Sequence, residues 1–209
     1  MILECRNPLT WPTKRRDQPG AEGTEMKIGT KSILFGAHCW FIHPWFVALA
    51  WWKLYGFPRD LRLWVAFFVH DLGYWGKPNM DGPEGEEHVL FGADLMHSLF
   101  DRHGDYPQWR ELCLYHSRFY AKKHGKPFSK LCVADKLAVT LEPWWFYLPR
   151  VIATGEVKEY MGLVESRYQV STKPQGKRDW FETMTNHMRG WVTEHQDLRR
   201  DTWTPEVSN

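Results

Sequence analysis

The segment 61–73, LRLWVAFFVHDLG, decides how this chain folds, because a long apolar run ends there in the polar doublet His70-Asp71. The preceding Asp60 can cap the start of a helix and the final glycine can end one, so the pattern predicts a helix over 61–72. On periodicity alone, the apolar run would also suit a buried strand. The helical interpretation therefore depends on these caps and on the helices predicted on either side.

The same start and stop signals predict helices along the rest of the chain. Before the doublet, a helix is expected from Pro44 to Tyr55. After it come a helix that starts at Asp81-Gly82-Pro83 and carries the stripe Val89, Ala93, Met96 and Phe100, a helix from Asp105 and Pro107 to about Tyr120, a helix from Ser129 through Leu141, and a packing helix with Trp180, Met184, Met188 and Trp191 on one face. Neither an Asn-Gly hairpin nor a pair of alternating strands is present in the sequence. We therefore predict an all-α fold, a compact single-domain helical bundle.

The length of 209 residues lies near the upper edge of one ordinary domain and allows a substantial core. A polar stretch with Pro and Gly near the start predicts a loosely ordered N-terminal leader over 1–31. The helical domain is expected over 32–200, followed by a C-terminal tail over 201–209.

Charge and cysteine content narrow the classes of function. A net charge of +2 is too small to indicate a stable nucleic-acid interface, which needs a clustered basic face. The four cysteines form no Cys-x-x-Cys pair, and three of them lie in apolar runs, as small buried thiols do. This cysteine usage favours a reducing cytoplasm.

One run requires a test for a membrane span, because Ser32–Trp52 contains no Asp, Glu, Lys or Arg. His38 and His43 interrupt the run, and Pro44 within it would remove a backbone hydrogen bond in lipid. Pro44 suits the start of a helix better. We therefore expect no membrane-spanning helix.

A series of imidazoles and carboxylates lies in these apolar helical segments. Its members are His43, His70, Asp71, His88, His116 and Asp135. Neutral imidazoles and carboxylates are the usual ligands of divalent ions, and burying them without partners would be costly. Taken singly, each would suit a hydrogen-bonded core position, but together they indicate a metal site with a hydrolytic water. His38 is a competing first ligand.

The region from His43 to Asp135 resembles the HD-domain superfamily of metal-dependent phosphohydrolases. The resemblance rests on an early histidine, His43, then the doublet His70-Asp71, and a late aspartate, Asp135, and it covers about half of the chain. It implies a helical bundle of the HD-domain type in which these four residues bind an ion.

The resemblance also implies roles for two further histidines. In members with two metals, residues at the positions of His88 and His116 bind the second ion and the aspartate of the doublet bridges, so the resemblance assigns catalytic roles to Asp71, His88 and His116. This chain has Tyr115-His116 where larger subfamilies carry two adjacent histidines. The implied cofactor is one or two divalent transition metal ions (Fe, Mn, Co, Ni or Zn, with Mg as a further option).

An anionic substrate needs fixed positive charge near the ion. The sequence offers Lys77 just after the doublet, Arg118 with Lys122 one helical turn later, and Lys136 beside Asp135. Aromatic side chains next to the doublet, Tyr74 and Trp75, could stack on a nucleobase.

Three functions remain open at this point. The leading hypothesis is a phosphohydrolase or phosphodiesterase that uses metal-activated water on a small anionic phosphate ester, such as a nucleotide. The alternatives are a mixed-valent diiron oxygenase on the same scaffold and a non-catalytic, metal-stabilised interaction module. The sequence predicts neither the oligomeric state nor which nucleotide would be bound.

Overall fold

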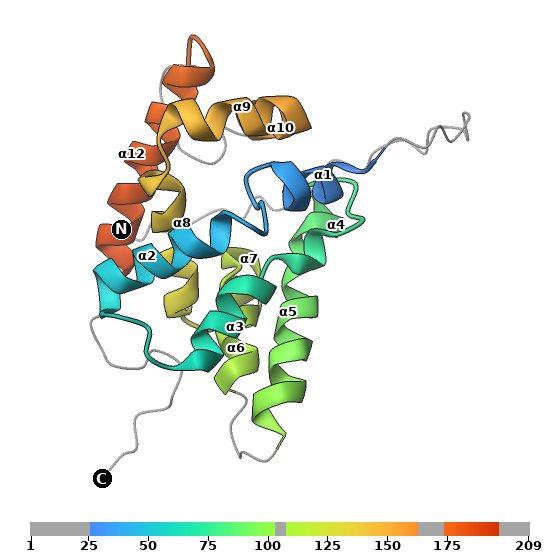
Figure 1. The fold of residues 1–209 in the computed structure, drawn as a ribbon, viewed down its shortest axis with the longest axis vertical. Coiled ribbons are helices and arrows are strands. Elements are labelled where there is room, and N and C mark those ends of the chain that lie inside the picture. Colours follow the sequence, from blue (N-terminus) through green and yellow to red (C-terminus); the bar gives the residue numbers. More distant parts are fainter. Residues whose placement is uncertain (1–25, 103–107, 163–173, 197–209) are drawn as a thin grey trace, which may run out of the picture.

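A computed structural model of the chain describes residues 26–102, 108–162 and 174–196 (Figure 1). Within these segments the chain forms helices joined by turns, and no strand occurs. The predicted all-α class is therefore confirmed. The bounds of the elements are α1 (Ile28–Phe35), α2 (His43–Tyr55), α3 (Leu61–Val69), η1 (Leu72–Tyr74), α4 (Pro83–Glu86), α5 (His88–Met96), η2 (His97–Asp101), α6 (Gln108–Leu114), α7 (Arg118–Lys123), α8 (Lys130–Leu141), α9 (Trp144–Thr154), α10 (Glu156–Gly162) and α12 (Lys177–His195).

Helix α8 lies at the centre of the bundle, with α2 packed on one side and α12 on another. Helices α5 and α6 pack against each other, and α3 contacts both α2 and α5. The main core fills the space between these helices with fully buried side chains such as Val47, Phe67, Val89, Leu112 and Leu131. Burial of this apolar surface is the main contribution to the stability of the bundle.

A second apolar cluster holds α9, α10 and α12 together. Its buried members include Tyr147, Val151, Trp180, Phe181 and Met184. Helix α9 also packs on α1, which brings the N-terminal end of the described chain next to this cluster. The predicted packing helix is confirmed as α12, in which Trp180, Met184 and Met188 are buried and Trp191 is half-buried. Helices α1, α9 and α10 were not predicted from the sequence.

Three predicted helices have different bounds in the structure. The helix that starts at Asp60 ends at Val69, and a 3₁₀ turn follows the doublet. The helix expected from Pro83 is interrupted at Glu87, which separates α4 from α5. The single helix expected to reach Tyr120 is instead two helices, because the chain turns after Leu114 and the hydroxyl of Ser117 caps α7. In each case the turn lies beside one of the candidate ligand histidines.

The predicted domain bounds are only partly covered by the described residues. Helix α1 begins at Ile28, so the last residues of the predicted leader are helical. Residues 1–25 of that leader, the start expected at Asp105 and Pro107, and the tail over 201–209 lie outside the described residues.

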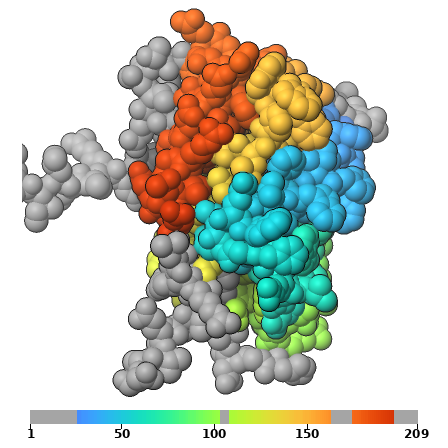
Figure 2. All heavy atoms as spheres, turned by 60° about the vertical axis from the view of Figure 1, so that its left-hand side comes forward, coloured from blue at the N-terminus to red at the C-terminus, as the bar shows by residue number. Residues whose placement is uncertain are grey.

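The charge-free run Ser32–Trp52 is divided between α1, a turn and α2. Among the described residues, no helix is both long and apolar enough to cross a membrane. Helix α2 lies at the surface of the molecule (Figure 2), and some of its aromatic side chains, Trp45 and Trp52 among them, are exposed.

Two glycines allow the segment that follows α3 to lie directly against α5. A Cβ added at Gly73 would overlap the backbone carbonyl group of His88. A Cβ at Gly92 would lie 2.8 Å from the carbonyl oxygen of Val69 and 2.9 Å from the Cα of His70. Because both positions lack a side chain, the His70-Asp71 doublet comes close to His88.

We expect Gly73→Ala to lower the free energy of unfolding by about 1–3 kcal/mol, because the added methyl group forces η1 away from α5. The control is Gly190→Ala on the exposed side of α12, where a Cβ meets nothing within 4 Å. There, alanine should raise the free energy of unfolding by about 0.8–1.0 kcal/mol through helix propensity. Urea unfolding of both variants measures the difference, and a neutral Gly73→Ala would contradict the close packing.

Candidate metal centre

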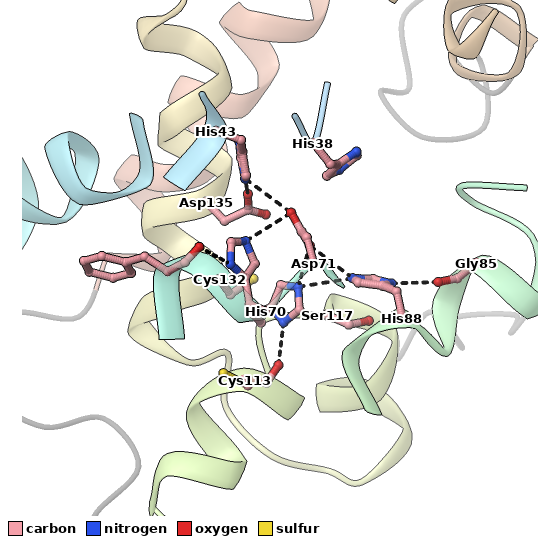
Figure 3. Close-up of polar contacts among 12 residues, drawn as sticks. His38, His43, His70, Asp71, Gly85, His88, Cys113, Ser117, Cys132 and Asp135 are labelled. Atoms are coloured by element: carbon pink, nitrogen blue, oxygen red, sulfur yellow. Dashed lines mark hydrogen bonds and ion pairs between the residues drawn. The ribbon is translucent and has the colours of Figure 1, made fainter. Parts of the chain in front are cut away.

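Six side chains from five parts of the fold lie close together, and Figure 3 labels five of them. They are His43 at the start of α2, His70 and Asp71 directly after α3, His88 at the start of α5, His116 after α6, and Asp135 in the middle of α8. All six are 8 % exposed or less. The structure therefore brings together the full set of candidate ligands singled out in the sequence.

The six residues form two groups that share Asp71. The first contains His43, His70, Asp71 and Asp135, and the second contains Asp71, His88 and His116. Oδ2 of Asp71 lies 3.1 Å from Nε2 of His70 and 3.4 Å from Nε2 of His43. Oδ1 lies 3.4 Å from Nε2 of His116 and 3.6 Å from Nε2 of His88. The two oxygens of one carboxylate thus belong to two different groups of imidazoles.

Three of the four imidazoles are held by the same local hydrogen bond. Nδ1 of His70 bonds to the carbonyl oxygen of Phe67 at 3.0 Å, and Nδ1 of His88 bonds to that of Gly85 at 2.7 Å. His116 makes the equivalent bond to Cys113. Each carbonyl lies three residues before its histidine, in the last turn of α3, α4 or α6. Carbonyls in the last turn of a helix lack the N–H donors that a further turn would provide. At these three positions the imidazole Nδ1–H donates to the carbonyl oxygen instead.

These bonds fix the tautomer of each ring. A carbonyl oxygen can only accept, so Nδ1 carries the proton and, in the neutral ring, Nε2 presents a lone pair. Nε2 of His88 and Nε2 of His116 are 3.1 Å apart, and Nε2 of His70 faces a carboxylate oxygen. Lone pairs at these separations repel each other unless a cation or a proton lies between them.

Buried polar atoms without hydrogen-bond partners also indicate that a cation belongs in the cluster. Among the described residues, Nε2 of His43, Nε2 of His70 and Oδ2 of Asp71 are buried and make no hydrogen bond. Such atoms are costly in a folded protein, and binding a divalent cation removes the cost. The donor set of imidazole nitrogens and carboxylate oxygens suits Fe, Mn, Co, Ni or Zn. The cluster could therefore hold a metal ion, and its geometry fits one.

The electrostatics of the two groups differ. Burial lowers the pKa of His70, but the nearby carboxylates Asp71 and Asp135 outweigh it and raise that pKa above its ordinary value. For His88, burial and the neighbouring His116 together hold the pKa well below its usual range. His88 is therefore neutral, which is the form that binds metals, whereas an ion bound at His70 would have to displace a proton.

Asp135 links the cluster to a half-buried cation. Its Oδ1 lies 3.0 Å from Nε2 of His43, and its Oδ2 accepts a hydrogen bond from Nζ of Lys136 at 2.6 Å. Burial lowers the pKa of Lys136, but Asp135 outweighs burial and raises it, so the ammonium group keeps its charge. A fixed positive charge thus lies next to the candidate metal centre.

His38, the competing first ligand, lies beside the cluster and belongs to neither group of ligand atoms. Its Nδ1 is 2.9 Å from the hydroxyl of Ser32, and burial lowers its pKa to about 4. The ring of Tyr74 stacks on His88 with ring centroids 3.9 Å apart and makes a tilted contact with His38 at 4.7 Å. His88 therefore covers one face of Tyr74, and the side chain is buried.

Two neighbouring cavities, which share part of their lining, lie at the cluster. The metal-side cavity, of about 80 Å³, is lined by Asp71, His88 and His116 and by neighbouring polar residues. A second cavity, of about 130 Å³, is lined by His43 and Asp135 and extends toward α12. The residues common to both are His38, Tyr74, Asp81, Arg118, Asp135 and Lys136.

Only some of the candidate substrate-binding residues reach these cavities. Tyr74 and Arg118 line both of them, as does Lys136. Lys77 forms an ion pair with Glu87 at 2.9 Å and lines neither cavity. Lys122 is exposed on α7, and Trp75 is 61 % exposed, and both also lie outside the two linings.

Several residues of the cavity wall were not found from the sequence. Glu142, Tyr160 and Trp180 line the larger cavity, although all three follow Asp135 in the chain and belong to no metal-binding pattern. The sequence predicts Trp180 only as a packing residue of its helix. A periodic apolar helix gives no signal that one of its side chains borders a cavity.

Comparison of the chain with models of known protein families, with curated proteins and with solved structures gave no match. The function must therefore be inferred from the geometry of the cluster and from the motif that forms it.

We expect Asp71→Ala to abolish metal binding, because one carboxylate completes both groups of ligands. The control is Asp94→Ala, whose side chain is 70 % exposed and lies outside the cluster. Elemental analysis after loading with Mn²⁺ and dialysis should find the ion in the wild type and the control only. Added Mn²⁺ should also raise the melting temperature of these two proteins and leave that of Asp71→Ala unchanged. An equal metal content in all three would contradict the assignment.

Proposed function

We propose that this protein is a metal-dependent phosphohydrolase of the HD-domain type, which cleaves a nucleotide or a related small phosphate ester. The observation that carries the proposal is the pair of ligand groups on either side of Asp71, next to two cations, Arg118 and Lys136, that line the same cavities. This combination of a site for divalent ions with fixed positive charge suits the hydrolysis of a phosphate ester.

The ligands would divide between two positions. His43, His70, Asp71 and Asp135 would hold one ion, and Asp71 with His88 and His116 would hold a second. A bound divalent cation would supply a polarised phosphoryl oxygen and a water of lowered pKa. The backbone-bonded rings of His70 and His88 keep their Nε2 lone pairs in place, so the ligands need little rearrangement when an ion binds.

Arg118 and Lys136 would bind and orient the phosphate group. Arg118 is the first residue of α7 and is half-buried, and Ser117 before it accepts hydrogen bonds from the start of that helix. Lys136 is held by Asp135. An arginine can donate two parallel hydrogen bonds to a phosphate, whereas a lysine acts as a point charge. Acidic side chains, Asp81 and Glu86, also line the metal-side cavity and would discourage anions from binding away from the two cations.

The same ligand set would also serve a diiron oxygenase, and the positive charge at Arg118 and Lys136 favours phosphate chemistry over that alternative. A protein that contains iron, consumes O₂ and releases no phosphate would support the oxygenase instead. A protein whose fold requires metal but that turns over neither substrate would support a metal-stabilised interaction module.

We expect the Mn²⁺-loaded protein to hydrolyse at least one member of a panel of nucleoside mono-, di- and triphosphates and cyclic nucleotides, as measured by the release of phosphate. For the cyclic nucleotides a phosphomonoesterase is added, because their cleavage alone releases no free phosphate. On the best substrate, Arg118→Gln should lower kcat/KM by about tenfold or more, as expected for the loss of a charged hydrogen bond. Lys122→Gln is the matched control, because Lys122 lies on the same helix but outside both cavities, and it should retain the activity of the wild type. No phosphate release across the panel, or equal loss in both variants, would contradict the proposal.

A further inference from the structure

The larger cavity continues beyond the metal centre into a space that the proposed hydrolysis does not use. The residues that it shares with the metal-side cavity are mainly polar, but most of those that line it alone are apolar or aromatic. We call this part the chamber, and its wall is formed by Val139, Tyr147, Tyr160, Trp180, Met184 and Met188. A substrate with its phosphate at Arg118 and Lys136 would have its organic part in the chamber.

The chamber wall contains buried polar atoms that have no hydrogen-bond partner among the described residues. They are Nε1 of Trp180 and the hydroxyl of Tyr160, together with Oε1 of Glu142 at the border of the chamber. Trp180 is 1 % exposed and Glu142 is 3 % exposed. The other oxygen of Glu142 pairs with Arg150, so Oε1 remains as an acceptor. Because the three side chains line the larger cavity, a polar occupant of the chamber could supply the partners that this N–H donor, hydroxyl and carboxylate acceptor lack.

The rest of the wall suits a flat ring. The rings of Tyr160 and Trp180 are parallel to within 6°, with centroids 6.2 Å apart, and form one rigid aromatic side. Met184 and Met188 add polarisable thioethers, which make favourable contacts with aromatic rings. The whole of the larger cavity, of which the chamber is one part, has a volume of about 130 Å³, close to that of the engineered cavity of about 150 Å³ that holds benzene. The chamber therefore has room for one six-membered ring at most. To pair with the unpartnered polar atoms, the edge of that ring needs both donors and acceptors, which an alkyl chain does not offer.

We infer that the chamber binds the base of a pyrimidine nucleotide, with the phosphate directed toward Arg118 and Lys136. A pyrimidine base is a single aromatic ring whose edge carries both a donor and acceptors. The donors of Trp180 and Tyr160 match the acceptors of the base, and Glu142 matches its N–H group. The direction of the phosphate depends on the proposed function, whereas binding of the base does not require a metal.

The experiment is calorimetric titration of the full chain with uridine, cytidine and ribose, none of which carries a phosphate. We expect a nucleoside to bind and ribose not to bind. Tyr160→Phe removes only the hydroxyl and should weaken nucleoside binding by about five- to tenfold, as expected for one hydrogen bond. Tyr120→Phe is the control, because Tyr120 is a buried tyrosine that lines neither cavity, and it should bind like the wild type. Melting temperatures of the two variants test whether both remain folded.

The outcomes separate this inference from the proposed function. Nucleoside binding that depends on Tyr160, without phosphate release from any nucleotide, supports the chamber and contradicts the phosphohydrolase. Phosphate release from ribose 5-phosphate at the same kcat/KM as from uridine or cytidine monophosphate contradicts the chamber and supports the phosphohydrolase. Failure of both nucleosides to bind, or equal binding by the wild type and Tyr160→Phe, overturns the inference.

Discussion

The structure depends on one local interaction that occurs three times, an imidazole Nδ1–H bonded to the carbonyl three residues earlier. At His70, His88 and His116 this bond caps the last turn of a helix and turns Nε2 toward Asp71. Turning any of these rings away from the carboxylate would break its hydrogen bond to the carbonyl. The end of each helix and the orientation of each ligand are fixed by the same hydrogen bond.

This arrangement places several buried polar atoms without hydrogen-bond partners close together in the core. Each buried polar atom without a partner costs about 1–3 kcal/mol, which is a large fraction of a typical stability of about 5–15 kcal/mol. Three such atoms lie in the cluster, on His43, His70 and Asp71. Burial of the apolar side chains around α8 has to offset this cost in the metal-free protein. A cation that binds only the folded cluster would remove it, and metal binding would then contribute directly to the stability of the bundle.

The sequence predicted the helical class, the doublet and all six members of the cluster, because caps and residue chemistry are local signals. It missed the turns at Glu87 and after Leu114, where tertiary contacts of His88 and His116 override helical periodicity. It also placed Lys77 and Lys122 near the site, since distance along the chain says nothing of the direction in which an exposed side chain points. The chamber could not be predicted, because Tyr160 and Trp180 come from helices with ordinary apolar patterns that meet α8 only through long-range packing.

The central claim is that Asp71 lies between two positions for divalent ions. The most direct test is a crystal structure of the protein grown with Mn²⁺, with anomalous difference maps that locate the ion. We expect anomalous density on the side of His43, His70 and Asp135, and a second peak on the side of His88 and His116. Maps without a peak on either side of the Asp71 carboxylate, with the imidazoles still in place, would contradict the claim.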